Sequence, residues 1–213
     1  MTMYTGDRVI MPRIETAVIG NEVPTRHYMD FFRGVFRSLG FDDKAPVYKA
    51  DVWGVGSLYA PAANGPGEAV VGGSVRGFAF DSAADEELHF SGMLRHDYRE
   101  GSALLPFVLW EPTTADAGNV VWGLDYSMAI IGDALPSPSS LSVTSAAAGV
   151  ADTVTRASFD EIEGEGLQRM SGVRGRVFRD ANNAADTYGA DATLCCVGFV
   201  YQGEGRGSMR GMP

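Results

Sequence analysis

Side chains that could do chemistry are few in this 213-residue sequence, and their spacing favours no reaction. The three histidines are His27, His89 and His96. A serine nucleophile on a sharp strand-to-helix turn has the pattern Gly-x-Ser-x-Gly, which is absent. His89 and His96 are too isolated for a histidine-rich metal site, so structural or surface roles are favoured. We therefore expect no catalytic residue, no metal ligand and no enzymatic activity.

Acidic clusters could bind calcium, which prefers several oxygen ligands on one short loop. The segment from Asp180 to Asp186 begins like an EF-hand loop, but Ala184 and Ala185 stand where an oxygen ligand and a turn glycine are needed. Two further groups of carboxylates are close in sequence: Asp81, Asp85, Glu86 and Glu87, and Asp160, Glu161, Glu163 and Glu165. Either group could line a cation site, but solvated loop charge is the favoured interpretation.

Glycine-rich segments could bind the phosphates of a nucleotide. In the segment that begins at Gly54-Val-Gly56, the pattern Gly-x-Gly-x-x-Gly fails because Tyr59 stands at the third glycine position. The segment from Gly203 to Gly207 follows an expected strand, but no helix follows it to present an N-terminus to a phosphate. We therefore expect no cofactor. A net charge of −10 also disfavours a nucleic-acid partner, whose phosphates attract basic surfaces.

The two cysteines, Cys195 and Cys196, are adjacent. Neighbouring side chains on a strand point to opposite faces, so a disulfide between them would be strained. We interpret them as two small apolar residues packed on either side of a strand.

The composition indicates a folded, turn-rich chain. It has 27 glycines, 10 prolines and 45% hydrophobic residues. This hydrophobic content is too high for a disordered protein. We therefore expect the glycines to mark turns between short strands. No stretch approaches the roughly 18 apolar residues that cross a bilayer, and Met1–Arg13 has no apolar run of signal-peptide length. We expect no membrane partner and synthesis in the cytoplasm.

One helix is predicted, over about residues 24–39. Pro24 suits its first turn, and Gly40 suits the position just after its end. Apolar residues recur along it with a period of 3.6: Tyr28, Phe31, Phe32, Val35, Phe36 and Leu39. Such a face must pack on something, either on the β core of its own chain or, as an arm, on another subunit. These six residues are our first candidates for a protein interface.

From Asp51 onward the helical period gives way to the alternation typical of strands. The clearest example is Asn119–Ile131, where large apolar residues alternate with small or polar ones. The other expected strands are Gly77–Phe80, Glu87–Arg95, Leu104–Trp110, Thr153–Ile162, Gln168–Arg179 and Ala192–Tyr201. Seven or eight strands with turns between them predict a mainly β fold, an antiparallel β-sandwich or jelly roll, with an N-terminal helical arm. Trp110 and Trp122 are expected to anchor the core.

These patterns divide the chain into three parts. We expect an N-terminal arm over residues 1–50, a jelly-roll-like β domain over 51–202 and a glycine-rich tail over 203–213. The tail carries Arg206 and Arg210, which we add to the interface candidates because an extended tail can follow the surface of a partner.

Five motifs follow one another along the expected β domain: Glu86–Phe90, Leu94–Ser102, Pro106–Trp110, Val121–Tyr126 and Val177–Ala181, the last continued by Asp186–Tyr188 and Asp191–Ala192. Between about Asp51 and Tyr201 they resemble a family of tailed-bacteriophage and prophage virion proteins with the motifs E-E-L-x-F, H-x-Y-x-E-G, W-G-L-x-Y and F-R-D-A. The resemblance implies a β-rich, oligomeric virion component without catalytic residues. Many relatives have histidines in a P-H-x-H-W segment, where this chain has Phe107 and Leu109, so no metal or pH-switch role follows for that strand.

From the residues and the resemblance we expect a structural protein located in the virion, a capsid decoration or cement protein. Its partners would be further copies of itself, in a homo-oligomer for which we expect a trimer, and the major capsid protein or other virion proteins. The alternatives are a tail, adaptor or fibre component that contacts a receptor, and a carbohydrate-binding or hydrolytic jelly roll.

Overall fold

The computed structural model describes residues 31–32, 35, 47–71 and 75–204. The chain divides into two compact units, Tyr48–Gly203 and a second made of Met1–Val47 with Glu204–Pro213. In the second unit, Phe31, Phe32 and Val35 are helical. The rest of the expected helix over 24–39, including Tyr28, Phe36 and Leu39, lies outside the described residues, as do Arg206 and Arg210 of the tail. The helical arm thus stays a prediction.

Strands make up almost all the regular structure of the described residues. They are β1 (Val47–Gly54), β2 (Gly67–Val71), β3 (Val75–Phe80), β4 (Glu86–Met93), β5 (Leu104–Pro112), β6 (Asn119–Ala129), β7 (Ser139–Ala146), β8 (Thr155–Ser158), β9 (Gly172–Arg179) and β10 (Ala192–Gly203). A short 3-10 helix, η1 (Val55–Ser57), follows β1. The predicted mainly β class is confirmed.

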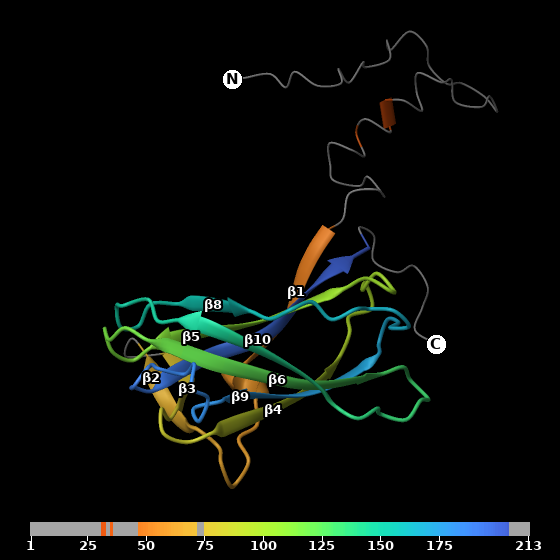
Figure 1. The fold of residues 1–213 in the computed structure, drawn as a ribbon. Coiled ribbons are helices and arrows are strands. Elements are labelled where there is room, and N and C mark those ends of the chain that lie inside the picture. The colour runs from red at the N-terminus through yellow and green to blue at the C-terminus, as the bar shows by residue number, and fades with distance from the viewer. Residues whose placement is uncertain (1–30, 33–34, 36–46, 72–74, 205–213) are drawn as a thin grey trace, which may run out of the picture. The chain divides into compact units, whose positions relative to one another are not determined.

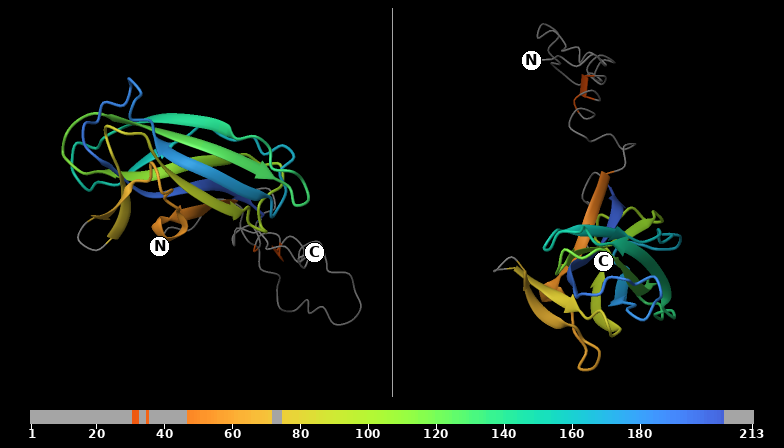
Figure 2. Two further views of the ribbon diagram at one scale, coloured as in Figure 1. Left: turned by 90° about the horizontal axis from the view of Figure 1, so that it is seen from below. Right: turned by 60° about the vertical axis from the view of Figure 1, so that its left-hand side comes forward.

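The strands form two antiparallel sheets packed face to face. Sheet A has the order β2-β3-β10-β5-β8, with β1 also paired to β10, and sheet B has the order β4-β9-β6-β7. Figure 1 shows β5, β8 and β10 in one layer and β4, β6 and β9 in the other. Figure 2 shows the same layers from below and from the side. The β unit is therefore a sandwich, as expected.

The strand pairs are nested along the chain. β3 pairs with β10, β4 with β9, β5 with β8 and β6 with β7. The chain from β3 to β10 is thus one long hairpin rolled up, with successive pairs in alternate sheets. Pairing of β10 with β5 and of β9 with β6 completes the two layers. This is the connectivity of a jelly roll.

The strand predictions succeed where the alternating apolar residues are many and large. All seven predicted strands overlap observed ones, but β1, β2 and β7 were not predicted. β7 is rich in serine, and β2 lies in a glycine-rich stretch, so neither has a large apolar face. β9 begins at Gly172 and not at Gln168, because Met170 has a φ of 63°, which interrupts an extended backbone.

The core lies between the inner faces of the two sheets. Trp110 of sheet A and Trp122 of sheet B are fully buried, with ring centroids 6.1 Å apart. Phe80 packs edge-on against Trp122 at 5.1 Å. The indole nitrogen of Trp110 donates a hydrogen bond of 3.0 Å to Ser145 Oγ, which ties β5 to β7. The predicted role of both tryptophans as core anchors is confirmed.

A buried arginine fixes the long loop between β9 and β10. Arg179 is fully buried and forms a two-point ion pair with Asp186, with Nε–Oδ2 and Nη2–Oδ1 distances of 3.0 and 2.8 Å. Its remaining N–H groups donate to the carbonyls of Phe80, Ala190 and Tyr188. All five guanidinium donors are therefore used, which is the condition for burying this charge. The Val177–Ala181 motif is thus explained by loop fixing.

Some glycines do not mark turns, which corrects the expectation from composition. Gly123 and Gly175 lie inside β6 and β9, each beneath a phenyl ring of the neighbouring strand. A Cβ at Gly123 would lie 2.1 Å from the ring of Phe178, and one at Gly175 would lie 2.2 Å from the ring of Phe90. Only glycine leaves room for these rings to lie flat on the sheet.

Candidate functional site

The outer face of sheet A is largely apolar where β1, β10 and β5 lie side by side. Because Trp53 of β1 and Leu104 and Val108 of β5 point into the core, the alternate residues of these strands face outward. The resulting surface, here called the apolar face, has these members: Tyr48, Val52, Leu105, Leu109 and Val200. Tyr48, Val52 and Leu105 expose 57%, 48% and 36% of their surface. This face spans β1, β10 and β5, which are neighbours in the sheet.

A buried carboxylate, that of Glu111, lies on the same side of β5. Glu111 is 9% exposed, and its Oε2 atom has no hydrogen-bond partner in the described part of the chain. Burial and, after it, the charge of Glu111 raise the pKa of the Cys195 thiol to about 12, so this cysteine stays protonated. Cys196 is buried, and both cysteines are free. A buried carboxylate oxygen that accepts no bond is costly unless a donor reaches it.

The outer face of sheet B is polar, and β9 supplies its central row. The pairing register places Arg176 between His89 of β4 and Asp125 of β6. Arg176 forms ion pairs of 2.5 Å with Glu87 and 2.6 Å with Asp125, while His89 Nε2 lies 3.2 Å from Glu87 Oε1. Burial opposes the charge of Arg176, but the bonds to Glu87 and Asp125 outweigh it and raise the pKa. We call this surface the ionic face.

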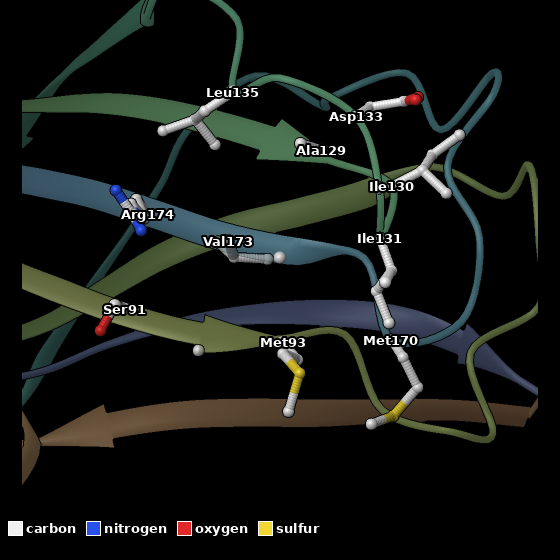
Figure 3. Close-up of a pocket in the computed structure, with 13 residues that line it drawn as sticks. Ser91, Met93, Ala129, Ile130, Ile131, Asp133, Leu135, Met170, Val173 and Arg174 are labelled. Carbon is white, nitrogen blue, oxygen red and sulfur yellow. The ribbon is translucent and has the colours of Figure 1, made fainter. Parts of the chain in front are cut away.

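Two residues earlier on β9, the register places Arg174 between Ser91 and Ser127. Arg174 is exposed and makes no hydrogen bond or ion pair with any residue that the structure describes. A pocket of about 580 Å³ lies at this end of the face, bounded by β4, β9 and the loop after β6. Figure 3 shows Arg174 at one end of it and Met93, Met170 and Ile131 at the other.

A second cluster of charged and polar side chains links Lys49 of β1 to Asp97, which lies between β4 and β5. Asp97 accepts hydrogen bonds from Lys49 and, at 3.1 Å, from the hydroxyl of Tyr201. Burial alone would raise the pKa of Asp97, but the bonds from Lys49 and Tyr201 outweigh it and hold the pKa below the ordinary 3.8. Burial and the Asp97 carboxylate raise the pKa of Tyr201 to about 12. This cluster is saturated by its own members, so we assign it a structural role.

The interface candidates from the sequence are described only in part. Phe31 and Val35 are half-buried and Phe32 is 43% exposed. The rings of Phe31 and Phe32 meet edge to face, with centroids 5.5 Å apart. The apolar face was not predicted from the sequence. A signal for it is present in Leu104–Trp110, where the outward positions are apolar as well as the core positions.

Two of the three acidic segments considered for calcium, Asp81–Glu87 and Asp180–Asp186, have structural partners. Asp186 binds Arg179, and Asp85 Oδ1 accepts a bond of 3.1 Å from the backbone N–H of Asn182. Glu86 Oε2 accepts a bond of 2.7 Å from the backbone N–H of Asp81. Among the described residues, no group of three or more histidine, cysteine or acidic side chains is arranged to hold a metal ion. No helix in those ranges is long and apolar enough to span a membrane.

No protein-family model matches the chain, and no curated protein matches it. Solved structures do. The chain is similar to a carbohydrate-binding module, CBM35 of Cellvibrio japonicus Abf62, with 10% identity and a TM-score of 0.39 over 73% of this chain and 98% of that one. It is also similar to the CBM22-2 xylan-binding domain of Paenibacillus barcinonensis Xyn10C, with 12% identity and a TM-score of 0.42 over 70% and 92%.

A third similar structure is that of infectious bursal disease virus, strain Gx, with 10% identity and a TM-score of 0.36. The match covers 74% of this chain but 33% of the viral one. At identities this low, the likeness to all three concerns the fold alone.

Proposed function

We propose that this chain is a non-catalytic structural protein of a tailed-bacteriophage particle, which self-associates and decorates the capsid by binding the major capsid protein. The observation that carries the proposal is the apolar face of sheet A. Exposed aliphatic and aromatic side chains grouped on neighbouring strands are typical of surfaces that other protein chains cover. Burying them releases about 25 cal/mol per Å² of apolar surface, which favours association.

The motifs behind the family resemblance have structural explanations in the described residues. Arg179 fixes a loop, Phe178 covers Gly123, and Tyr98 donates a hydrogen bond to the carbonyl of Ser102 in the turn before β5. Each interaction holds a loop, a strand or a turn of the jelly roll in place. This supports a scaffold role for the shared sequence pattern.

The oligomeric state tests self-association. In analytical ultracentrifugation we expect the full chain to form a homo-oligomer, with a trimer as the specific expectation. Replacing Val52 and Leu105 together by lysine should leave a folded monomer, because charges on the apolar face cannot be buried. The matched control Val150→Lys changes a valine that is 60% exposed outside this face and should leave the oligomer intact. A double variant that sediments like the wild type would overturn the proposal.

Copy number in purified particles tests the location. Quantitative mass spectrometry should find hundreds of copies if the protein decorates the capsid. A dozen copies or fewer would instead place it in the tail or its adaptor. Deleting residues 1–40 should abolish particle binding and leave the jelly roll folded, and undiminished binding would remove the arm from the proposed contacts.

A further inference from the structure

Two arginines of β9 lie on the ionic face, and they differ in their ion-pair partners. Arg176 is held by Glu87 and Asp125 and is neutralised within the sheet. Arg174, on the same face of β9, has Ser91 and Ser127 at the two cross-strand positions nearest to it. Hydroxyls cannot neutralise a guanidinium, so Arg174 keeps its full charge and its five donors for another group.

The position of Arg174 makes it accessible to a ligand. It lines both the pocket of about 580 Å³ and a neighbouring one of about 370 Å³. Ser91 also lines both pockets, so the two hollows meet at the row of Ser91 and Arg174. A planar guanidinium beside a hydroxyl at such a junction suits a carboxylate, which accepts two parallel N–H bonds and one O–H bond.

The larger pocket adds an apolar wall to this anion site. Figure 3 shows Met93 at the end of β4, Met170, and Ile131 and Leu135 from the loop after β6 around the hollow. Met93 is 52% exposed and Ile131 is 69% exposed, so both have surface left for a ligand. Methionine side chains are flexible and polarisable, which suits them to accept aliphatic groups of varied shape.

Met170 is placed by a strained turn. Its φ of 63° is unusual for a residue that is not glycine. Hydrogen bonds hold it, since Met170 N–H donates to the Leu94 carbonyl at 3.1 Å and the Ser171 hydroxyl accepts from Gln168 N–H at 3.1 Å. The turn keeps Met170 at the wall of the pocket.

The two pockets that meet at Ser91 and Arg174 are here called the trough. We propose that the trough binds a short, extended peptide segment of a partner protein, in which an aliphatic side chain stands next to a carboxylate. The carboxylate binds Arg174 and Ser91, and the aliphatic group packs on Met93, Met170 and Ile131. Asp133 lies on the pocket wall and forms no ion pair with Arg174. It repels a carboxylate from the loop side, so the charge of the peptide is directed to Arg174.

The test uses the full chain labelled with ¹⁵N and three capped tetrapeptides as probes. The first contains adjacent leucine and glutamate, the second replaces the glutamate by glutamine, and the third replaces the leucine by alanine. The first should shift the amide signals of Ser91, Met93 and Arg174 with a millimolar Kd. Each of the other two should bind about tenfold more weakly, because each lacks one of the two contacts.

Substitutions in the protein complete the test. Arg174→Gln should weaken binding of the glutamate peptide about tenfold and leave binding of the glutamine peptide unchanged. The control Arg99→Gln removes an exposed arginine whose Nη1 lies 3.4 Å from Gln202 Oε1, and it should have no effect. Spectra of the free variants establish that each is folded.

Three results would overturn the proposal. The first is equal binding of the glutamate and glutamine peptides. The second is the absence of saturable shifts along the trough with all peptides. The third is tighter binding of trigalacturonic acid than of any peptide, which would assign the trough to an acidic saccharide. None of these results depends on the oligomeric state or on particle binding, so this proposal and the capsid proposal can fail separately.

Discussion

The outer faces of the two sheets differ although their inner faces are alike. Inside, both sheets contribute large apolar side chains, as Trp110 and Trp122 illustrate. Outside, β1, β10 and β5 of sheet A present aliphatic and aromatic residues. Sheet B presents the network of Glu87, Arg176 and Asp125, and Arg174, which forms no ion pair with the residues that the structure describes. Folding constrains the inner faces most, because a sandwich forms once one side of each sheet is apolar. The outer faces are free to carry what the protein contacts.

The two outer faces also share one packing arrangement. Phe178 lies over Gly123 on sheet B, and Phe107 lies over Gly198 on sheet A, where a Cβ would come within 2.7 Å of the ring. Each ring fills the space above a glycine of the neighbouring strand. The difference between the faces therefore lies in their side-chain chemistry and not in how their strands are packed.

The largest expected effect concerns the inner side of β9. Arg179→Met should lower the free energy of unfolding by about 3–5 kcal/mol, because it leaves the buried Asp186 carboxylate and three carbonyls without their donors. Urea unfolding followed by fluorescence measures the change. A loss below about 1 kcal/mol would show that water replaces the guanidinium and that the buried pair does not hold the loop.

Adding one methyl group should destabilise both faces. Gly123→Ala and Gly198→Ala should each lower the free energy of unfolding by about 1–3 kcal/mol. Phe178 must leave its place over Gly123, while a Cβ at Gly198 would lie 2.7 Å from the ring of Phe107 and 2.8 Å from the backbone carbonyl of Asp51. Gly56→Ala is the matched control, because nothing lies within 4 Å of a Cβ at that position. Unfolding curves for the three variants provide the comparison. An effect on one sheet only would contradict the shared packing device.

The ion pairs of the ionic face should contribute less. Arg176→Gln is expected to lower the free energy of unfolding by about 0.5–1 kcal/mol, because its side chain is 38% exposed and the pairs are screened by water. High salt should reduce the difference from the wild type. A loss as large as that of Arg179→Met would mean that the outer network, and not the buried arginine, holds β9 in place.

The smallest expected effect is a pH dependence from Asp97. Because its folded pKa lies below the ordinary 3.8, the stability it contributes is fully present above that value and is lost as the pH falls through 3.8 to the folded pKa. Asp97→Asn should therefore flatten the stability profile in this acidic window and leave the slope near pH 7 unchanged. Thermal melts across the window measure it. An equally steep profile in Asp97→Asn would locate the acid sensitivity elsewhere.

Much of the jelly roll could be predicted because alternation is a local property of the sequence. Asn119–Ile131 alternates strongly, and β6 occupies Asn119–Ala129. β7 was missed, although Leu141 and Val143 alternate with serine and threonine, because its side chains are small and its turn-like composition resembles a loop. Strand signals depend on the size of the apolar face more than on its period.

The candidate surfaces could not be predicted in the same way. Arg174, Arg176 and Arg179 are three arginines within six residues of one strand, and nothing local distinguishes them. Their roles depend on the residues that face them across the sheet, such as Ser91 or His89 from β4, which lie more than 80 positions earlier in the chain. The same holds for Gly123 and Gly175, because the phenyl rings that cover them belong to neighbouring strands.

The sequence by itself determined the class of this protein: a mainly β chain with turn-separated strands, two core tryptophans, and neither a nucleotide motif nor a nucleophile motif. Hydrophobic period and composition suffice for that, because they act over a few residues. Only the tertiary structure decided which strands share a sheet, which arginine is buried, paired or free, and which face is apolar. These properties arise from pairing between distant segments such as β3 and β10, so a pattern within one segment does not determine its partner.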